Sequence, residues 1–434
     1  MLAPIPFLPM PASIPIPSRF LLLCLASTGA LLPDARADTA SWTGWRGAAR
    51  DARVEHFAPP EVWPEALERA WRVEVGTGYA TPVVVGGRIY QHAREGDEEV
   101  LRCLELGSGR SVWRKSMPVA FEPGRGGERH GRGPKSTPAY ADDRIFTMSI
   151  TGTVAAWSAD DGDLLWKRDF RERFQPAHPY WGTATSPLVD QGRLFVHPGS
   201  CEDGALFCLD PATGEDVWVQ DAHANCYSSP FIETVDGVRQ LIGLNHDGLC
   251  GIDLASGRVL WHYTFPHHGN NQNTPTPVFH DGVFVVGAED RGIFGVRPRR
   301  VDGEWSVERI WRHREVSLDM SSPVVLDGAV YGFSEFKTGQ LFCLDPMTGK
   351  VHWTGEPRGG DNAQLLSVAG HALVLNDRGD LQVLRANRER CEVVRRYQVA
   401  EDATWAAPAL LGDALLVKDR THLALWRFPA RSEE

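Results

Sequence analysis

Two nearly identical phrases decide the fold of this chain: LFCLDPATGEDVW at residues 206–218 and LFCLDPMTGKVHW at residues 341–353. In each phrase, alternating apolar residues predict a half-buried strand, a tight turn ends in Gly, and a second strand closes on Trp. Weaker copies begin at Leu101, Val154 and Leu249. The Gly of each turn suits a positive φ. From its length alone, a chain of 434 residues would be expected to form two or three domains. The internal repeats indicate a single repetitive domain instead.

A second motif precedes each copy of the phrase. A Ser/Thr-Pro pair opens an apolar strand, a Gly-containing turn follows, and a second apolar strand returns, which suits Pro because it is tolerated at the start of a strand. Clear copies begin at Thr81, Ser136, Thr185, Ser228, Thr276 and Ser321, and degenerate copies begin at Leu365 and Ala407. Eight units of four short antiparallel strands, about 45 residues apart, predict an all-β fold, a single eight-bladed β-propeller. The eighth unit lacks a fourth strand, and we expect AWRVEV, from Ala70, to supply it and close the ring.

The Trp that closes each unit is expected to pack between neighbouring blades, because an aromatic side chain buries roughly 150–250 Å². The predicted inter-blade residues are Trp71, Trp113, Trp166, Trp218, Trp261, Trp311 and Trp353. The seventh unit has Arg395 and Tyr397 in this region instead.

The N-terminus resembles a secretory signal. Arg19 precedes an apolar run at residues 20–32, and Ala35-Arg36-Ala37 fits the A-x-A pattern of signal peptidase. The run is shorter than the roughly 20 residues of a membrane-spanning helix, and either Met1 or Met10 could start the chain. We therefore expect an exported protein, periplasmic or secreted, with no transmembrane span after cleavage. The expected organisation is a signal peptide at 1–37, an N-terminal strap at 38–69, the propeller at 70–428 and a C-terminal tail at 429–434.

Composition narrows the function classes. The chain is 42% hydrophobic and 23% charged, so it can bury a large core. Its net charge of −11 is spread along the sequence, and no basic cluster alternates with aromatic residues, so we expect no nucleic-acid partner. The densest basic run, Arg297–Arg300, is expected to be a solvated loop. We also expect a monomer.

The repeat resembles that of the PQQ-like β-propeller family, whose pattern is a small or aromatic residue, Leu-Asp, two residues, Thr-Gly and then Trp. The resemblance covers residues 42–428. WTGWRGAARDARV, from Trp42, is similar to the opening of many exported bacterial propellers of this family, with Trp45 in place of Phe and Ala52 in place of Gly. The family includes quinoprotein dehydrogenases and outer-membrane assembly factors of the BamB type. The resemblance therefore implies the fold far more specifically than the function.

A quinoprotein dehydrogenase is one function that the resemblance implies. Enzymes of this kind carry adjacent cysteines beside the quinone and use Glu, Asn and Asp around Ca²⁺. This sequence has no adjacent cysteines and no C-x-x-C-H haem motif, although Asn273, Asp319 and Glu335 could serve as ligands. No short spacing of His ligands predicts a metal site. We expect no enzyme activity and no cofactor, with PQQ and calcium as the alternative.

Two cysteines differ from the rest by their position. Cys201 is expected between the second and third strands of one unit, and Cys226 in the loop that leads into the next unit. Such loops share one face of a propeller, and export permits a disulfide. A disulfide and two separate thiols are both possible.

Loops of two kinds are expected to converge on one face around the central channel: those that lead into each blade and those between its second and third strands. Their charges, amides and indoles suit a protein partner or a small polar ligand, although loops are also polar simply because they are solvated. The candidate binding residues are Lys135, Trp181, Asn225, His246, Asp247, Asn273, Glu289, Asp290, Arg291, Asp319, Glu335, Asp361, Arg378 and Trp405. We expect a non-catalytic exported binding or scaffolding module of the cell envelope, and a quinoprotein-like oxidoreductase is the alternative.

Overall fold

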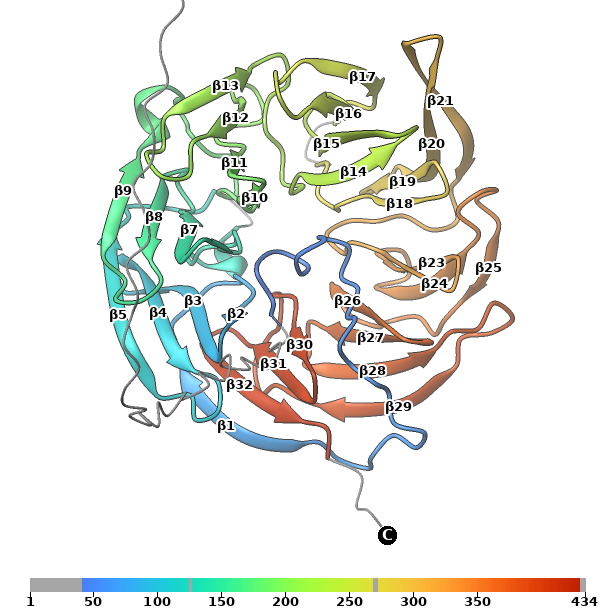
Figure 1. The fold of residues 1–434 in the computed structure, drawn as a ribbon. Coiled ribbons are helices and arrows are strands. Elements are labelled where there is room, and N and C mark those ends of the chain that lie inside the picture. The colour runs from blue at the N-terminus through green and yellow to red at the C-terminus, as the bar shows by residue number, and fades with distance from the viewer. Residues whose placement is uncertain (1–40, 125–126, 268–271, 430–434) are drawn as a thin grey trace, which may run out of the picture. The chain divides into compact units, whose positions relative to one another are not determined.

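The computed structural model describes residues 41–124, 127–267 and 272–429. Eight four-stranded antiparallel sheets follow one another around a ring (Figure 1), which confirms the predicted eight-bladed β-propeller. The predicted signal peptide lies outside the described residues. Within the described part of the chain, no helix is long and apolar enough to cross a membrane.

The first four blades follow directly from the repeat. Blade 1 contains β2 (Val83–Val85), β3 (Arg88–Glu95), β4 (Glu98–Glu105) and β5 (Ser111–Pro118); blade 2 contains β6 (Ala139–Ala141), β7 (Arg144–Met148), β8 (Val154–Ser158) and β9 (Leu164–Arg168). Blade 3 contains β10 (Leu188–Asp190), β11 (Arg193–Val196), β12 (Leu206–Leu209) and β13 (Asp216–Gln220); blade 4 contains β14 (Phe231–Val235), β15 (Val238–Leu244), β16 (Gly248–Asp253) and β17 (Val259–Thr264). Two short 3₁₀ helices, η1 (Glu128–His130) and η2 (Phe170–Glu172), lie in the loops that lead into blades 2 and 3.

The remaining blades include a long hairpin and the closure of the ring. Blade 5 contains β18 (Val278–His280), β19 (Val283–Ala288), β20 (Gly292–Val301) and β21 (Glu304–His313); blade 6 contains β22 (Val324–Leu326), β23 (Ala329–Ser334), β24 (Gln340–Leu344) and β25 (Val351–Thr354). Blade 7 contains β26 (Ala363–Val368), β27 (His371–Asn376), β28 (Asp380–Arg385) and β29 (Val393–Gln398). Blade 8 combines β30 (Ala409–Leu411), β31 (Ala414–Lys418) and β32 (His422–Arg427) with β1 (Glu68–Glu74), which pairs antiparallel with β32. The ring is therefore closed by the N-terminal strand, as predicted.

The prediction for Arg297–Arg300 is wrong. These residues continue β20 and pair with β21 in the long hairpin of blade 5, so the basic run is part of a strand. Within this run Pro298 is buried, whereas Arg299 and Arg300 are exposed to solvent.

The outer strands are joined by a repeated Trp–Gly contact. The indole nitrogen of Trp166 in β9 donates to the carbonyl oxygen of Pro211 in the next blade at 3.0 Å. A Cβ atom at Gly214 would lie 2.7 Å from the Trp166 ring, and Gly214 has φ +76°, so this turn requires glycine for two reasons. The same Trp–Gly contact recurs in the pairs Trp71–Gly109, Trp113–Gly162, Trp218–Gly257 and Trp311–Gly349.

Trp261 departs from this pattern because blade 5 has the long hairpin in place of the short Gly turn. Its indole donates to Gln240 Oε1 of its own blade at 2.6 Å. Trp353, by contrast, reaches the next blade and donates to the Asn387 carbonyl at 2.7 Å.

Serine and threonine hydroxyls join the blades near the axis. The residue directly before the strand-opening proline accepts a hydrogen bond from the backbone N–H of the equivalent residue in the preceding blade. These hydrogen bonds run from Thr81 to Thr137 (3.1 Å), from Thr137 to Ser186 (3.0 Å), from Ser186 to Ser229 (3.0 Å) and from Thr276 to Ser322 (2.9 Å). We call the six residues Thr81, Thr137, Ser186, Ser229, Thr276 and Ser322 the hydroxyl ring. Their hydroxyls explain why the motif carries Ser or Thr before Pro.

Blade 7 breaks the ring of hydroxyls. It has Gln364-Leu365 where most blades have Ser/Thr-Pro, and its inner strand begins at Ala363, ahead of the position at which the other inner strands begin. Leucine has the N–H that proline lacks, so this strand can pair over a greater length. The link from blade 6 is made instead by the Ser321 hydroxyl, which donates to Asn362 Oδ1 at 2.8 Å.

The N-terminal strap reaches the centre of the ring (Figure 1), where Arg46 donates to the Pro323 carbonyl and Arg50 donates to the Pro230 carbonyl. It forms bridges to blade 1 at Val84 and to blade 7 at Ser367. Arg50 is buried and donates to the backbone carbonyls of Ser186, Pro187 and Pro230, directly beneath the hydroxyl ring. Because these are innermost carbonyls of two blades, the strap holds the blades together at the axis.

Candidate functional site

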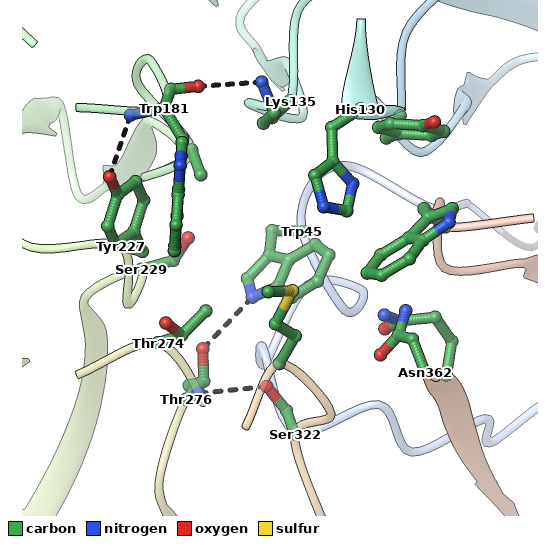
Figure 2. Close-up of a pocket in the computed structure, with 15 residues that line it drawn as sticks. Trp45, His130, Lys135, Trp181, Tyr227, Ser229, Thr274, Thr276, Ser322 and Asn362 are labelled. Atoms are coloured by element: carbon green, nitrogen blue, oxygen red, sulfur yellow. Dashed lines mark hydrogen bonds between the residues drawn. The ribbon is translucent and has the colours of Figure 1, made fainter. Parts of the chain in front are cut away.

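The open end of the channel is an axial pocket of about 140 Å³. Its floor includes the indole of Trp45 from the strap, which donates from Nε1 to Thr276 Oγ1 at 3.3 Å (Figure 2). Every one of the eight blades contributes at least one lining residue. The pocket therefore lies on the axis of the ring, with the strap indole as part of its lining.

The pocket wall is a second ring of residues, located three positions before the strand-opening proline. We call these residues the variable ring: Tyr79, Lys135, Ala184, Tyr227, Thr274, Met320, Asn362 and Trp405. They lie two residues before the hydroxyl-ring position. Since side chains alternate along extended backbone, both positions in each blade face the axis. The hydroxyl ring is nearly uniform, whereas the variable ring differs from blade to blade.

Aromatic side chains form two groups in the pocket lining. The Trp181 and Tyr227 rings lie 5.8 Å apart, and the Tyr227 hydroxyl accepts the Trp181 backbone N–H at 3.0 Å. On the other side, Trp405 packs against Tyr79 at 6.1 Å and against the edge of His130 at 4.5 Å. These contacts hold flat apolar faces toward the cavity, a surface suited to a planar or apolar group.

Two buried carboxamides provide the polar part of the pocket. Asn362 and Gln364 are only 1% and 7% exposed, and both line the cavity. Asn362 uses Oδ1 for the Ser321 hydroxyl, which leaves Nδ2 available. Among the residues that the structure describes, the Gln364 side chain has no hydrogen-bond partner. The Gln364 side chain is largely buried, but its amide atoms stay accessible from the cavity, so they are available to bond an occupant.

The basic group in the pocket wall is Lys135. Its ammonium donates to the Trp181 carbonyl oxygen at 2.8 Å. Burial lowers the pKa of Lys135 to about 8, although the Glu99 carboxylate opposes this shift. Burial also lowers the pKa of His130 to about 4, helped by the charges of Arg129 and Lys135, so His130 is neutral at pH 7. The pocket wall therefore carries one positive charge near neutral pH.

Three carboxylates gather beside the pocket. Glu289, Asp319 and Glu335 have oxygen atoms within 4.8 Å of one another, and Asp319 is next to Met320 of the variable ring. Burial, followed by the charges of Glu289 and Glu335, raises the pKa of Asp319 to about 7. Burial likewise raises the pKa of Glu335. A cation would relieve this repulsion, so these residues are the ones that could hold a metal ion.

Of the candidate binding residues, Lys135, Trp181 and Trp405 line the axial pocket. Glu289, Asp319 and Glu335 form the carboxylate cluster, and the backbone N–H of Asp290 donates to Glu335 Oε1 at 2.7 Å.

Other candidate residues hold loops in place. Asn225 donates to the Gly199 carbonyl, and Asn273 donates to the Asn245 and Phe265 carbonyls and accepts from Arg291. His246 packs edge-on against His267, and Asp247 lies 3.3 Å from His223 Nδ1. The backbone N–H of Asp361 donates to Asp377, and Arg378 donates to the Arg358 carbonyl.

Cys201 and Cys226 lie together between blades 3 and 4, on the face predicted from the sequence. Each sulfur atom is 3.4 Å from Gln272 Oε1, and both are free thiols in the structure. The Asn273 N–H donates to the Cys226 sulfur at 3.2 Å. A disulfide between them stays a prediction. Cys226 precedes Tyr227, so the pair adjoins the pocket wall.

Sequence reasoning missed most of the variable ring, including Tyr79, Tyr227, Met320 and Asn362. A usable signal was present, because each lies three residues before the strand-opening position of its repeat. Trp45 was noted in the strap motif, but its place at the axis depends on the closure of the ring.

The fold, the repeats and the axial pocket define an eight-bladed propeller of the PQQ-like repeat class. Residues 96–355 match the family model described as outer membrane protein assembly factor BamB, and the chain belongs to this family.

Relatives and solved structures agree with this assignment. The chain is 27% identical to the outer membrane protein assembly factor BamB of Nitrosomonas eutropha over 53% of this chain and 56% of that protein, so it spans little more than half of that relative. It is 24% identical to the BamB of Burkholderia pseudomallei over 81% and 85% of the two chains. It is also 25% identical to the quinohemoprotein alcohol dehydrogenase ADH-IIG of Pseudomonas putida over 48% of this chain and 31% of the enzyme. The crystal structure of BamB from Moraxella catarrhalis superposes with a TM-score of 0.62 at 15% identity, covering 85% of this chain and all of that one, and shows the same fold.

Proposed function

We propose that the protein is an exported, monomeric and non-catalytic binding module that takes part in the assembly of outer-membrane proteins. Membership of the BamB family supports this role. The observation that carries the proposal is the contrast around the axis. The blades share one scaffold of hydroxyls, but each presents a different side chain to the pocket and the surrounding loop face. Side chains that differ from blade to blade, on a shared scaffold, favour a binding role for the loop face.

The loop face also exposes an aromatic side chain suited to partner contact. Tyr180 is 58% exposed and lies next to Trp181 of the pocket wall. Aromatic residues at interfaces supply much of the binding energy. The partner surface is therefore centred on the loop that leads into blade 3.

Site-specific photo-crosslinking in the organism that encodes the protein tests this surface. A crosslinking residue placed at Tyr180 should capture a component of the outer-membrane protein assembly apparatus. The matched control is Val301, which is 62% exposed near the tip of the blade 5 hairpin, away from the axial pocket. Equal crosslinking at both positions, or normal amounts of folded outer-membrane proteins after deletion of the gene, would contradict the proposal.

A quinoprotein dehydrogenase is the second candidate, favoured by the three carboxylates next to an axial pocket with a Trp in its floor. The charge of the pocket argues against this candidate. PQQ carries three carboxylates on three fused rings, whereas the lining supplies one cation, Lys135, in a cavity of about 140 Å³. Equilibrium dialysis with PQQ and Ca²⁺, followed by a dye-linked alcohol oxidation assay, decides between the two. Stoichiometric binding with turnover would establish the enzyme.

A further inference from the structure

We propose that the axial pocket binds a small aromatic carboxylate with a single ring and a hydroxyl substituent. This ligand goes beyond partner binding by the loop face, because it enters a cavity that the loops surround. The proposal rests on three features of the pocket: its size and walls, the available groups of its two amides, and its single cation.

The size and the walls select a single aromatic ring. A cavity of about 150 Å³ with apolar walls holds one benzene molecule in another protein, and this pocket measures about 140 Å³. Trp45, Trp181 and Trp405 line the pocket and come from three different parts of the chain. Planar rings pack on indole rings in stacked or edge-on geometry.

The two amides of the pocket favour a ligand whose aromatic ring carries a hydroxyl group. Gln364 occupies the position at which six other blades carry a Ser or Thr that joins blades together. Within the described residues its amide makes no hydrogen bond, and Asn362 Nδ2 is likewise available beside it. A side chain that replaces a structural hydroxyl, is 7% exposed and lines a cavity is placed to bond an occupant. A phenolic hydroxyl can both donate to an amide oxygen and accept from an amide nitrogen.

The ammonium group of Lys135 favours a ligand that carries a carboxylate at the end opposite its hydroxyl group. One hydrogen bond, to the Trp181 carbonyl, leaves further ammonium donors available. Figure 2 shows Lys135 and Asn362 on different sides of the pocket, with Trp45 between them. A ligand that lies over Trp45 could therefore direct its carboxylate to Lys135 and its hydroxyl to the amides. The same charge disfavours an organic cation, which aromatic walls alone would otherwise accept.

Isothermal titration calorimetry of the mature protein with three matched compounds tests the proposal without any mutation. We expect 4-hydroxybenzoate to bind with a Kd below about 1 mM, within the range that ligand efficiency allows. Benzoate lacks the hydroxyl and should bind about fivefold more weakly, while 4-hydroxybenzamide lacks the charge and should bind about tenfold more weakly. Equal affinities for the three compounds, or no binding, would overturn the proposal.

A variant locates the site. Gln364→Met should remove the preference for 4-hydroxybenzoate over benzoate. The control Gln220→Met makes the same change at a glutamine that is 8% exposed in β13, outside the axial pocket, and should leave the preference intact. Two further compounds identify other occupants. Tighter binding of N-acetyltyrosinamide would assign the pocket to a partner's tyrosine, tighter binding of PQQ would assign it to a quinone, and either result would overturn the proposal.

Discussion

The hydroxyl ring and the variable ring lie two residues apart in six of the eight blades, yet they have different roles. The hydroxyl ring repeats Ser or Thr in six blades, and its members bond to one another from blade to blade. The variable ring presents aromatic, basic, amide, thioether and small side chains to one cavity. Where neighbouring blades must fit together, the repeat is constrained; where the blades face the pocket, it is free to vary. The difference indicates that scaffold and site can be altered separately at positions such as Ser186, which lies outside the pocket lining, whereas Ser229, Thr276 and Ser322 belong to the hydroxyl ring and also line the pocket.

The largest effect is expected beneath the hydroxyl ring, at Arg50. Its guanidinium binds the carbonyls of Ser186, Pro187 and Pro230, and burial lowers its pKa to about 9. Arg50→Met leaves these carbonyls without their donor, which should cost about 3–5 kcal/mol in unfolding free energy. Differential scanning calorimetry should show a fall in Tm. Arg53→Met, at an exposed arginine of the same strap, is the control and should change stability by less than about 0.5 kcal/mol. Equal Tm values for both variants would contradict the role of the strap.

The two rings can be compared directly within blade 3. Ser186 Oγ accepts the buried N–H of Thr137 at 3.0 Å, so Ser186→Ala should destabilise the fold by about 1–3 kcal/mol. Ala184→Ser, two residues away in the variable ring, should change stability by less than about 0.5 kcal/mol. Urea unfolding of both variants measures the difference. A neutral Ser186→Ala would show that the hydroxyl ring is not a stabilising element.

A smaller effect is expected beside the variable ring at Asp319, whose pKa burial and neighbouring carboxylates raise to about 7. Between about pH 4, the ordinary pKa of Asp, and pH 7, the folded state binds more protons at this site than the unfolded state. Wild-type stability therefore falls as pH rises through this window. Asp319→Asn should raise Tm by about 1–3 °C at pH 7.5 in the presence of EDTA and leave Tm nearly unchanged near pH 4.

The control for this prediction is Asp302→Asn, at the exposed turn of the blade 5 hairpin. It should shift Tm little at either pH. A loss of stability for Asp319→Asn at pH 7.5 would mean that the carboxylate is stabilised by a partner that outweighs its like-charged neighbours.

The sequence predicts the fold well because the contacts that build it repeat. Trp166 and Gly214 recur at one spacing because each Trp packs on the Gly turn of the next blade. The residues of the axial pocket are harder to predict from the repeat. Lys135, Trp181 and Trp405 were predicted because they fall in loops, whereas Gln364 was overlooked because it sits within the strand motif itself.

Other parts of the site depend on long-range closure. Trp45 is far from the blades in sequence and reaches the axis only because the strap crosses the assembled ring. The carboxylates of Glu289, Asp319 and Glu335 come from three different loops, and their spacing along the chain does not indicate that they meet. The position of Trp45 and the proximity of the three carboxylates are set by the closed ring and not by local sequence.

The most direct test of the account compares one variant from each ring by two measurements, Tm and the Kd for 4-hydroxybenzoate. Ser186→Ala should lower Tm and keep the wild-type Kd at a temperature well below unfolding. Trp405→Leu, in the variable ring, should keep Tm within about 2 °C, because the side chain is only partly buried, and should weaken binding at least tenfold. The reverse pattern, with binding lost in Ser186→Ala and retained in Trp405→Leu, would contradict the separation of scaffold and site.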